Sequence, residues 1–72
     1  MNATFEVRPS ESCEFDVWLV GRKDGWEYHE KLFEVFLVDS NYVILASKTC
    51  KPLGVCDCSI DALSAWIKER NI

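Results

Sequence analysis

The segment 59–70, SIDALSAWIKER, constrains the fold most, because it predicts one clear amphipathic helix. Its apolar residues recur at the three- and four-residue spacings of a single helical face: Ile60, Leu63, Trp66 and Ile67. Ser59 is a good N-cap residue, and Asp61 suits the positive end of the helix dipole. A helix with one apolar face has to bury it, so we expect this helix to lie across a sheet formed by the preceding residues.

Two short segments near the N-terminus alternate between apolar and polar residues. They are residues 4–8 and 14–20, and the segment PSES between them has turn composition. Alternation puts every second side chain on the same face of a strand. An antiparallel pair of strands is therefore predicted, with five apolar side chains facing the core: Phe5, Val7, Phe15, Val17 and Leu19.

The segment 26–38, WEYHEKLFEVFLV, is compatible with two structures. After the break at 21–25 it alternates as a strand would, and its aromatic and β-branched residues favour that state. The alternative is a helix capped by Asp24, with Glu27 three residues later as the capping-box partner. We favour a strand that forms a hairpin with the next apolar run.

That next run, 42–48, is almost continuously apolar, which predicts a central strand covered on both faces. Pro52 and Gly54 indicate that the cysteine-containing segment 49–58 is a loop. The predicted fold is therefore a small α+β domain spanning 1–72. It has a strand-rich part over 3–48, an antiparallel sheet of about four strands, and one C-terminal helix packed on it in two layers.

Size and charge exclude several classes of function. The 72 residues carry a formal net charge of −4, and residues 1–47 hold nine acids and only four bases. An acidic domain repels phosphate backbones, so direct nucleic-acid binding is not expected. No apolar run approaches the roughly 20 residues that span a bilayer, and the N-terminus lacks the features of a secretory signal. We therefore expect a cytoplasmic protein that binds no membrane.

Enzymatic activity is not expected either. His29 is the chain's single histidine, and no nucleophile elbow or phosphate-binding loop accompanies it. A domain of this size also has little room for a ligand cavity of roughly 300 Å³. We predict a protein without catalytic residues and without a cofactor.

The predicted strands place a tryptophan among acids on the face that points away from the core. These candidate partner-binding residues are Glu6, Glu14, Asp16 and Trp18. Tryptophan is enriched at binding hot spots, and acids steer basic partners. The sequence thus predicts a non-enzymatic, acidic protein-interaction module for a larger protein with a basic surface. One form of it is an inhibitor that occludes a nucleic-acid-binding surface. The alternative is that Trp18 and Val20 are buried beneath the helix or another segment.

The four cysteines suggest an alternative function, a structural zinc site or a thiol redox sensor. A zinc site would need Cys13, Cys50, Cys56 and Cys58, or His29 in place of Cys13, to meet in the fold. Their spacings match no standard zinc knuckle. We therefore favour thiols that act as small apolar side chains. A further prediction is a homodimer formed through an unpaired edge strand at residues 4–8.

Overall fold

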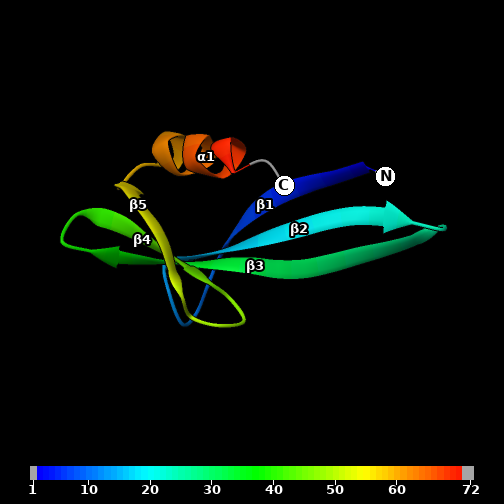
Figure 1. The fold of residues 1–72 in the computed structure, drawn as a ribbon, viewed down its shortest axis with the longest axis horizontal. Helices are drawn as coiled ribbons and strands as arrows, with labels where there is room; N and C mark the ends of the chain where they lie inside the picture. Colours follow the sequence, from blue (N-terminus) through cyan, green and yellow to red (C-terminus); the bar gives the residue numbers. More distant parts are fainter. Residues whose placement is uncertain (1, 71–72) are drawn as a thin grey trace.

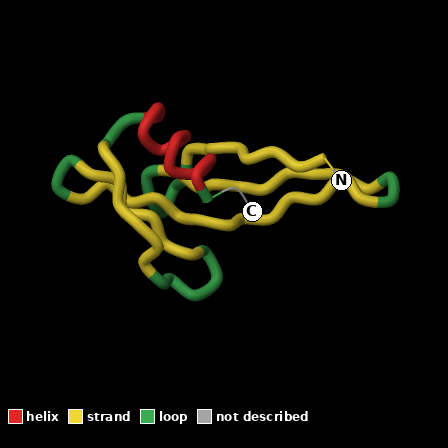
Figure 2. The backbone as a smooth tube through the Cα atoms, turned by 45° about the horizontal axis from the view of Figure 1, so that its top comes forward, coloured by secondary structure: helices red, strands yellow, loops and turns green. Residues whose placement is uncertain are grey.

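The computed structural model describes residues 2–70 and confirms the α+β fold (Figures 1 and 2). Five antiparallel strands and one C-terminal helix follow in chain order: β1 (Asn2–Pro9), β2 (Phe15–Lys23), β3 (Trp26–Val38), β4 (Asn41–Ala46), β5 (Pro52–Asp57) and α1 (Ile60–Glu69). Every strand lies beside its neighbour in sequence, so β1 and β5 form the two edges of the sheet. The molecule is elongated, with extents of 43 × 22 × 20 Å.

Two tight hairpins organise the long strand β3. Asp24 and Gly25 connect β2 to β3 with φ of 54° and 81°, and Asp39 and Ser40 connect β3 to β4 with φ of 49° and 64°. Two successive residues with positive φ match the right-handed twist of an antiparallel pair. The strand interpretation of 26–38 is therefore confirmed, and the alternative helix capped by Asp24 is wrong.

The core lies between α1 and one face of the sheet. On that face Val17 is opposite Phe33, and Val35 is opposite Ile44. Val17, Val35 and Ile44 are fully buried, as is Leu63 of α1. The helix begins as predicted, because the Ser59 side chain accepts a hydrogen bond from the Ala62 amide at 3.0 Å. Within residues 2–70, no helix is long and apolar enough to cross a membrane.

Strand β5 corrects the prediction of a loop at 49–58. Pro52 and Gly54 are turn residues in most contexts, and they hid this strand in the sequence. An edge strand tolerates proline, particularly at its first residue. Gly54 is required for another reason: a β-carbon there would lie 2.6 Å from Nε1 of Trp66, so the indole lies directly on the backbone of β5.

Three smaller predictions are also wrong. Strand β2 continues through the expected break at 21–25 to Lys23, and only Asp24 and Gly25 form the turn. Leu19 and Ile60 were expected in the core, but Leu19 is outside the core cluster and Ile60 is 50% exposed. The strand β4 is covered by α1 on one face alone, because the chain provides a single helix for the described sheet.

Replacing Gly54 with alanine tests the contact between β5 and the helix. The new methyl group would overlap the Trp66 ring, so we expect Gly54→Ala to lower the free energy of unfolding by about 1–3 kcal/mol. Urea unfolding followed by circular dichroism measures this loss. In a Trp66→Leu background the same replacement should cost less, because a smaller side chain gives way. An equal cost in both backgrounds would contradict this close approach.

Candidate functional site

The face of the sheet opposite α1 is here called the open face, because no helix of the described chain covers it. Residues directly opposite one another on adjacent strands share a face of the sheet. Three rows of side chains cross β1, β2 and β3 on the open face: Thr4, Val20 and His29; Glu6, Trp18 and Lys31; Arg8, Asp16 and Glu34. Charged groups dominate these rows.

The structure brings three of the four predicted partner-binding residues together. Glu6, Asp16 and Trp18 lie on the open face, on the neighbouring strands β1 and β2. Glu14 precedes β2 and is exposed, and its backbone amide donates a hydrogen bond of 2.9 Å to the carbonyl oxygen of Val35. The backbone of Glu14 therefore lies beside β3, and its carboxylate acts on the pKa of Tyr42.

Trp18 is half-buried, although no helix covers it. Its neighbour Val17 points into the core, so Trp18 points to the opposite face, and the alternative of burial beneath α1 is wrong. The guanidinium of Arg8 lies over the indole ring, 4.9 Å from the ring centroid. This is cation–π geometry, so the chain's own arginine shields the predicted hot-spot residue.

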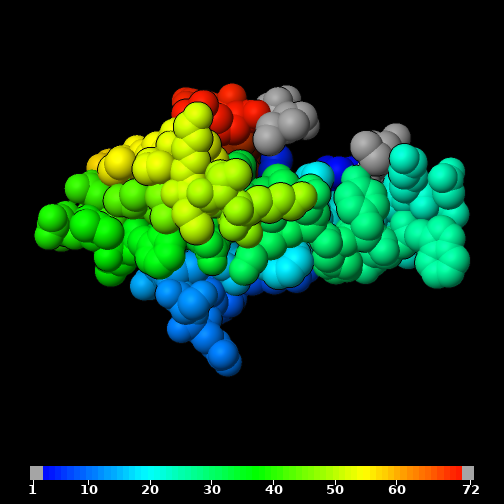
Figure 3. Space-filling model, turned by 60° about the horizontal axis from the view of Figure 1, so that its bottom comes forward, coloured from blue at the N-terminus to red at the C-terminus, as the bar shows by residue number. Residues whose placement is uncertain are grey.

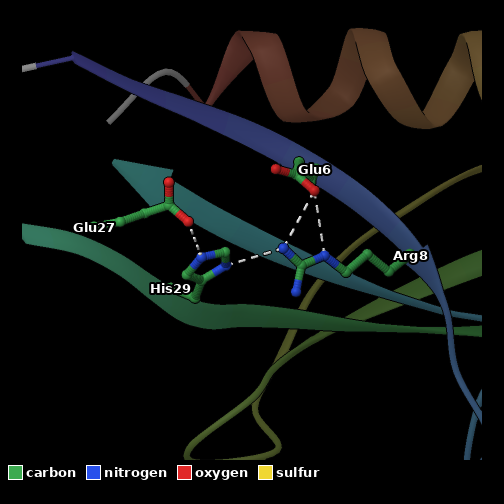
Figure 4. Close-up of polar contacts among 4 residues, drawn as sticks. All are labelled: Glu6, Arg8, Glu27 and His29. Atoms are coloured by element: carbon green, nitrogen blue, oxygen red, sulfur yellow. Dashed lines mark hydrogen bonds and ion pairs between the residues drawn. The ribbon is translucent and has the colours of Figure 1, made fainter. Parts of the chain in front are cut away.

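Arg8 also belongs to a chain of polar contacts from β1 to β3 (Figure 4). Its guanidinium donates to Oε1 of Glu6 at 3.2 Å and to Nδ1 of His29 at 3.0 Å. Because arginine only donates, Nδ1 of His29 accepts, and Nε2 donates to Oε1 of Glu27 at 2.8 Å. The hydrogen bond from His29 lowers the pKa of Glu27. Both ring nitrogens of His29 therefore have a partner, one on β1 and one on β3.

A second group of charges surrounds Lys31. Its Nζ lies 4.0 Å from Oδ1 of Asp16 and 3.8 Å from Oε2 of Glu34. The ligand-type atoms of Cys13, Asp16 and Glu34 lie within 4.8 Å of one another, which makes this the one candidate metal group among residues 2–70. The Lys31 ammonium already balances part of the negative charge of Asp16 and Glu34, so the chain itself supplies a cation at this position.

The acids of the open face are therefore largely compensated within the molecule. Arg8 pairs with Glu6, Lys31 lies between Asp16 and Glu34, and His29 binds Glu27. Sequence reasoning missed these partners, because the pairing depends on the register of three strands. A β-bulge shifts that register: Val17 is opposite Phe33 and Trp18 is opposite Lys31, which leaves Leu32 as an extra residue.

The four cysteines do not assemble into the zinc site considered above. All four are free, and no three of their sulfur atoms lie within 4.8 Å of one another in the described chain. Cys50 and Cys58 are exposed, whereas Cys13 and Cys56 are half-buried. The Cys13 thiol donates to the carbonyl oxygen of Phe15 at 3.2 Å. Cys56 and Cys58 both act on the Tyr42 hydroxyl, whereas the Cys13 thiol contacts the backbone of β2.

Two groups at the β4–β5 pair have altered acidity. Burial is the main cause that raises the pKa of Tyr42, and a hydrogen bond with the Cys58 side chain adds to it. Burial also raises the pKa of the Cys56 thiol, and the negative charge of Asp57 acts in the same direction. Both effects favour the neutral form in the folded protein.

Two hollows lie at the boundary between α1 and the sheet. One, of about 250 Å³, is lined mainly by Phe5, Val7 and Ile67. The other, of about 220 Å³, is lined by Phe33, Leu53, Trp66 and Arg70. Neither lining includes a carboxylate, a thiol or an imidazole. The hollows therefore offer apolar contact and one basic group each.

Replacing Tyr42 with phenylalanine tests the raised pKa of its hydroxyl. The folded state holds the proton above the ordinary pKa of 10.0, so the associated stability is complete below about pH 10. It is lost as the pH rises from 10 through the raised pKa, because the unfolded tyrosine ionises first. We expect the Tyr42→Phe variant not to lose this stability at alkaline pH. Urea unfolding at pH 7.5, 9.5 and 11 measures it, and a wild-type–variant difference independent of pH would contradict this assignment.

The thiols should react with alkylating reagents at different rates. We expect iodoacetamide at pH 8 to label exposed Cys50 faster than Cys56, whose half-buried thiol has a raised pKa. Peptide mass spectrometry after timed quenching gives the order. Labelling in urea is the control, because unfolding should remove the difference. Equal rates in the folded protein would show that β5 does not protect Cys56.

Comparisons with known proteins identify no relative of the chain. No family model matches it, and neither the curated proteins nor the solved structures contain a match.

Proposed function

We propose that this protein is a non-enzymatic, acidic protein-interaction module that binds a basic surface of a larger protein through the open face. The observation that carries the proposal is the common location of Glu6, Asp16 and Trp18 on a sheet face without helix cover. The net charge of −4 favours a basic partner and disfavours a nucleic acid.

Binding at Trp18 would involve an exchange of cations. A lysine or arginine of the partner can take the place of Arg8 over the indole ring and beside Glu6. Exposed ion pairs contribute only about 0–1 kcal/mol, so displacing Arg8 costs little. The partner's base and the aromatic ring then become buried together, and both interactions strengthen as water is excluded.

In its inhibitory form, the module occludes the nucleic-acid-binding surface of the partner. Such surfaces carry clustered lysines and arginines, which an acidic face complements. We also propose a cytoplasmic location, where four free thiols remain reduced. Dimerisation through the edge strand β1 remains a prediction.

The test is affinity capture with the immobilised protein from an extract of the cells that produce it. We expect Trp18→Ala, and the double variant Glu14→Lys with Asp16→Lys, to reduce the captured partner at least about tenfold. Circular dichroism checks that the variants fold. The captured protein should lose nucleic-acid binding when the module is added.

Ile60→Ser is the matched control, because Ile60 is exposed on the helix side and its replacement should leave capture unchanged. Capture that is insensitive to Trp18, Glu14 and Asp16 would refute the proposal. Capture abolished by a chelator or by an oxidant would instead support the cysteine-based alternative, a zinc-binding or redox-sensing module.

A further inference from the structure

The open face changes character where β3, β4 and β5 lie together. Phe36, Val43 and Val55 are directly opposite one another on these strands, and Val38 and Asp57 flank Asn41 in the next row. Phe36, Val38, Val43 and Val55 do not belong to the core or to the residues packed against it. We call Phe36, Val38, Val43, Val55 and Asp57 the β3–β5 patch.

This patch exposes a large share of its apolar surface. Val55 is 60% exposed and Val38 is 48% exposed, and Phe36 and Val43 are half-buried between them. Figure 3, with the bottom of Figure 1 turned forward, shows β4 and β5 in green and yellow beside each other, and the loop after β1 in blue below them. A contiguous apolar group on a small protein is typical of an interaction surface.

The acids around the patch differ from those near Trp18. Asp57 belongs to the patch, Asp39 lies in the adjoining turn, and Glu14 is held beside Val35. None of these three carboxylates forms a salt bridge within residues 2–70. Lys48 and Lys51, the bases that flank β4 and β5, lie at the opposite end of these strands from Asp39 and Asp57. The negative charge here is uncompensated.

Charge also decides between two occupants of the patch. A two-fold dimer through it would bring each copy's Asp57, Asp39 and Glu14 close to those of the other copy. Like charges in contact oppose binding, whereas basic residues of another protein would be attracted. To pack on Phe36, Val43 and Val55, the partner segment must also carry apolar side chains. The patch therefore suits a partner segment that carries both.

We propose that the β3–β5 patch is the main docking surface, and that its occupant is a partner segment with alternating basic and apolar residues. The apolar side chains pack on Phe36, Val43 and Val55, and the basic groups pair with Asp57, Asp39 and Glu14. This inference rests on the proposed binding of a basic protein, and it moves the centre of contact from Trp18 to the other end of the open face.

The experiment titrates the ¹⁵N-labelled full chain with the peptide Lys-Val-Lys-Val-Lys-Val-Lys and follows amide shifts by NMR. We expect the largest shifts at Val43, Val55 and Asp57. Asp57→Asn and Val55→Thr should each weaken peptide binding about fivefold, since each removes one charge or one apolar contact. Both side chains are on the surface, so the variants should fold.

The control variants are Glu69→Gln, exposed at the end of α1, and Trp26→Ala, at the hairpin tip where the indole is 78% exposed. Neither should change the affinity more than twofold. A Glu-Val peptide of the same length should not bind, because it repels the acids.

Other outcomes overturn the inference. Shifts centred on Trp18 that weaken with Glu6→Gln would leave the basic-partner function intact but place the contact elsewhere. Weaker peptide binding by Trp26→Ala would place the contact at the hairpin tip. Equal binding of the Glu-Val peptide would exclude charge complementarity. Shifts at the patch that change with protein concentration alone would show that its occupant is a second copy of the chain. An absence of peptide binding would also overturn the patch, while the capture experiment decides the proposed function separately.

Discussion

A single helix covers a five-stranded sheet, and the rest of the structure follows from this constraint. Leu63 and Ile67 of α1 bury one face of the sheet over Val17, Val35 and Ile44. A chain of 72 residues provides no second helix within its described part, so the other face meets solvent. Every side chain on that open face is therefore solvated, paired on the sheet or covered by a partner molecule.

The two ends of the open face meet this requirement in different ways. At β1 and β2, cross-strand contacts satisfy the charges: Arg8 connects Glu6, Trp18 and His29, and Lys31 lies between two carboxylates. At β3–β5, the apolar row and Asp57 have no such partners in the described chain. An external partner gains most where apolar surface and charge are both unsatisfied. This difference separates a self-contained surface from one suited to binding.

The sequence predicts the fold well wherever one periodic pattern dominates. The helix and its Ser59 cap follow from local spacing, and so do the strands containing Val17 and Val35. Strand β5 was missed because Pro52 and Gly54 resemble a turn, although Trp66, distant in the sequence, explains the glycine. Local patterns cannot report such tertiary contacts.

The candidate site was only partly predictable for the same reason. Alternation placed Trp18, Glu6 and Asp16 on one face, but their compensation by Arg8 and Lys31 depends on strand register and on a bulge at Leu32. The β3–β5 patch is hidden in the sequence because the apolar run 42–48 predicts burial on both faces. With one helix available, only one of those faces is covered.

The most direct test of the open face as a binding surface is methyl cross-saturation NMR on a complex with the captured partner. The module is deuterated and methyl-labelled, and the partner's protons are saturated. We expect signal loss at Val43 and Val55 on the open face, with Val20 affected if contact extends to Trp18. Loss confined to Ile60 or to other methyl groups of α1, with Val43 and Val55 unaffected, would contradict it.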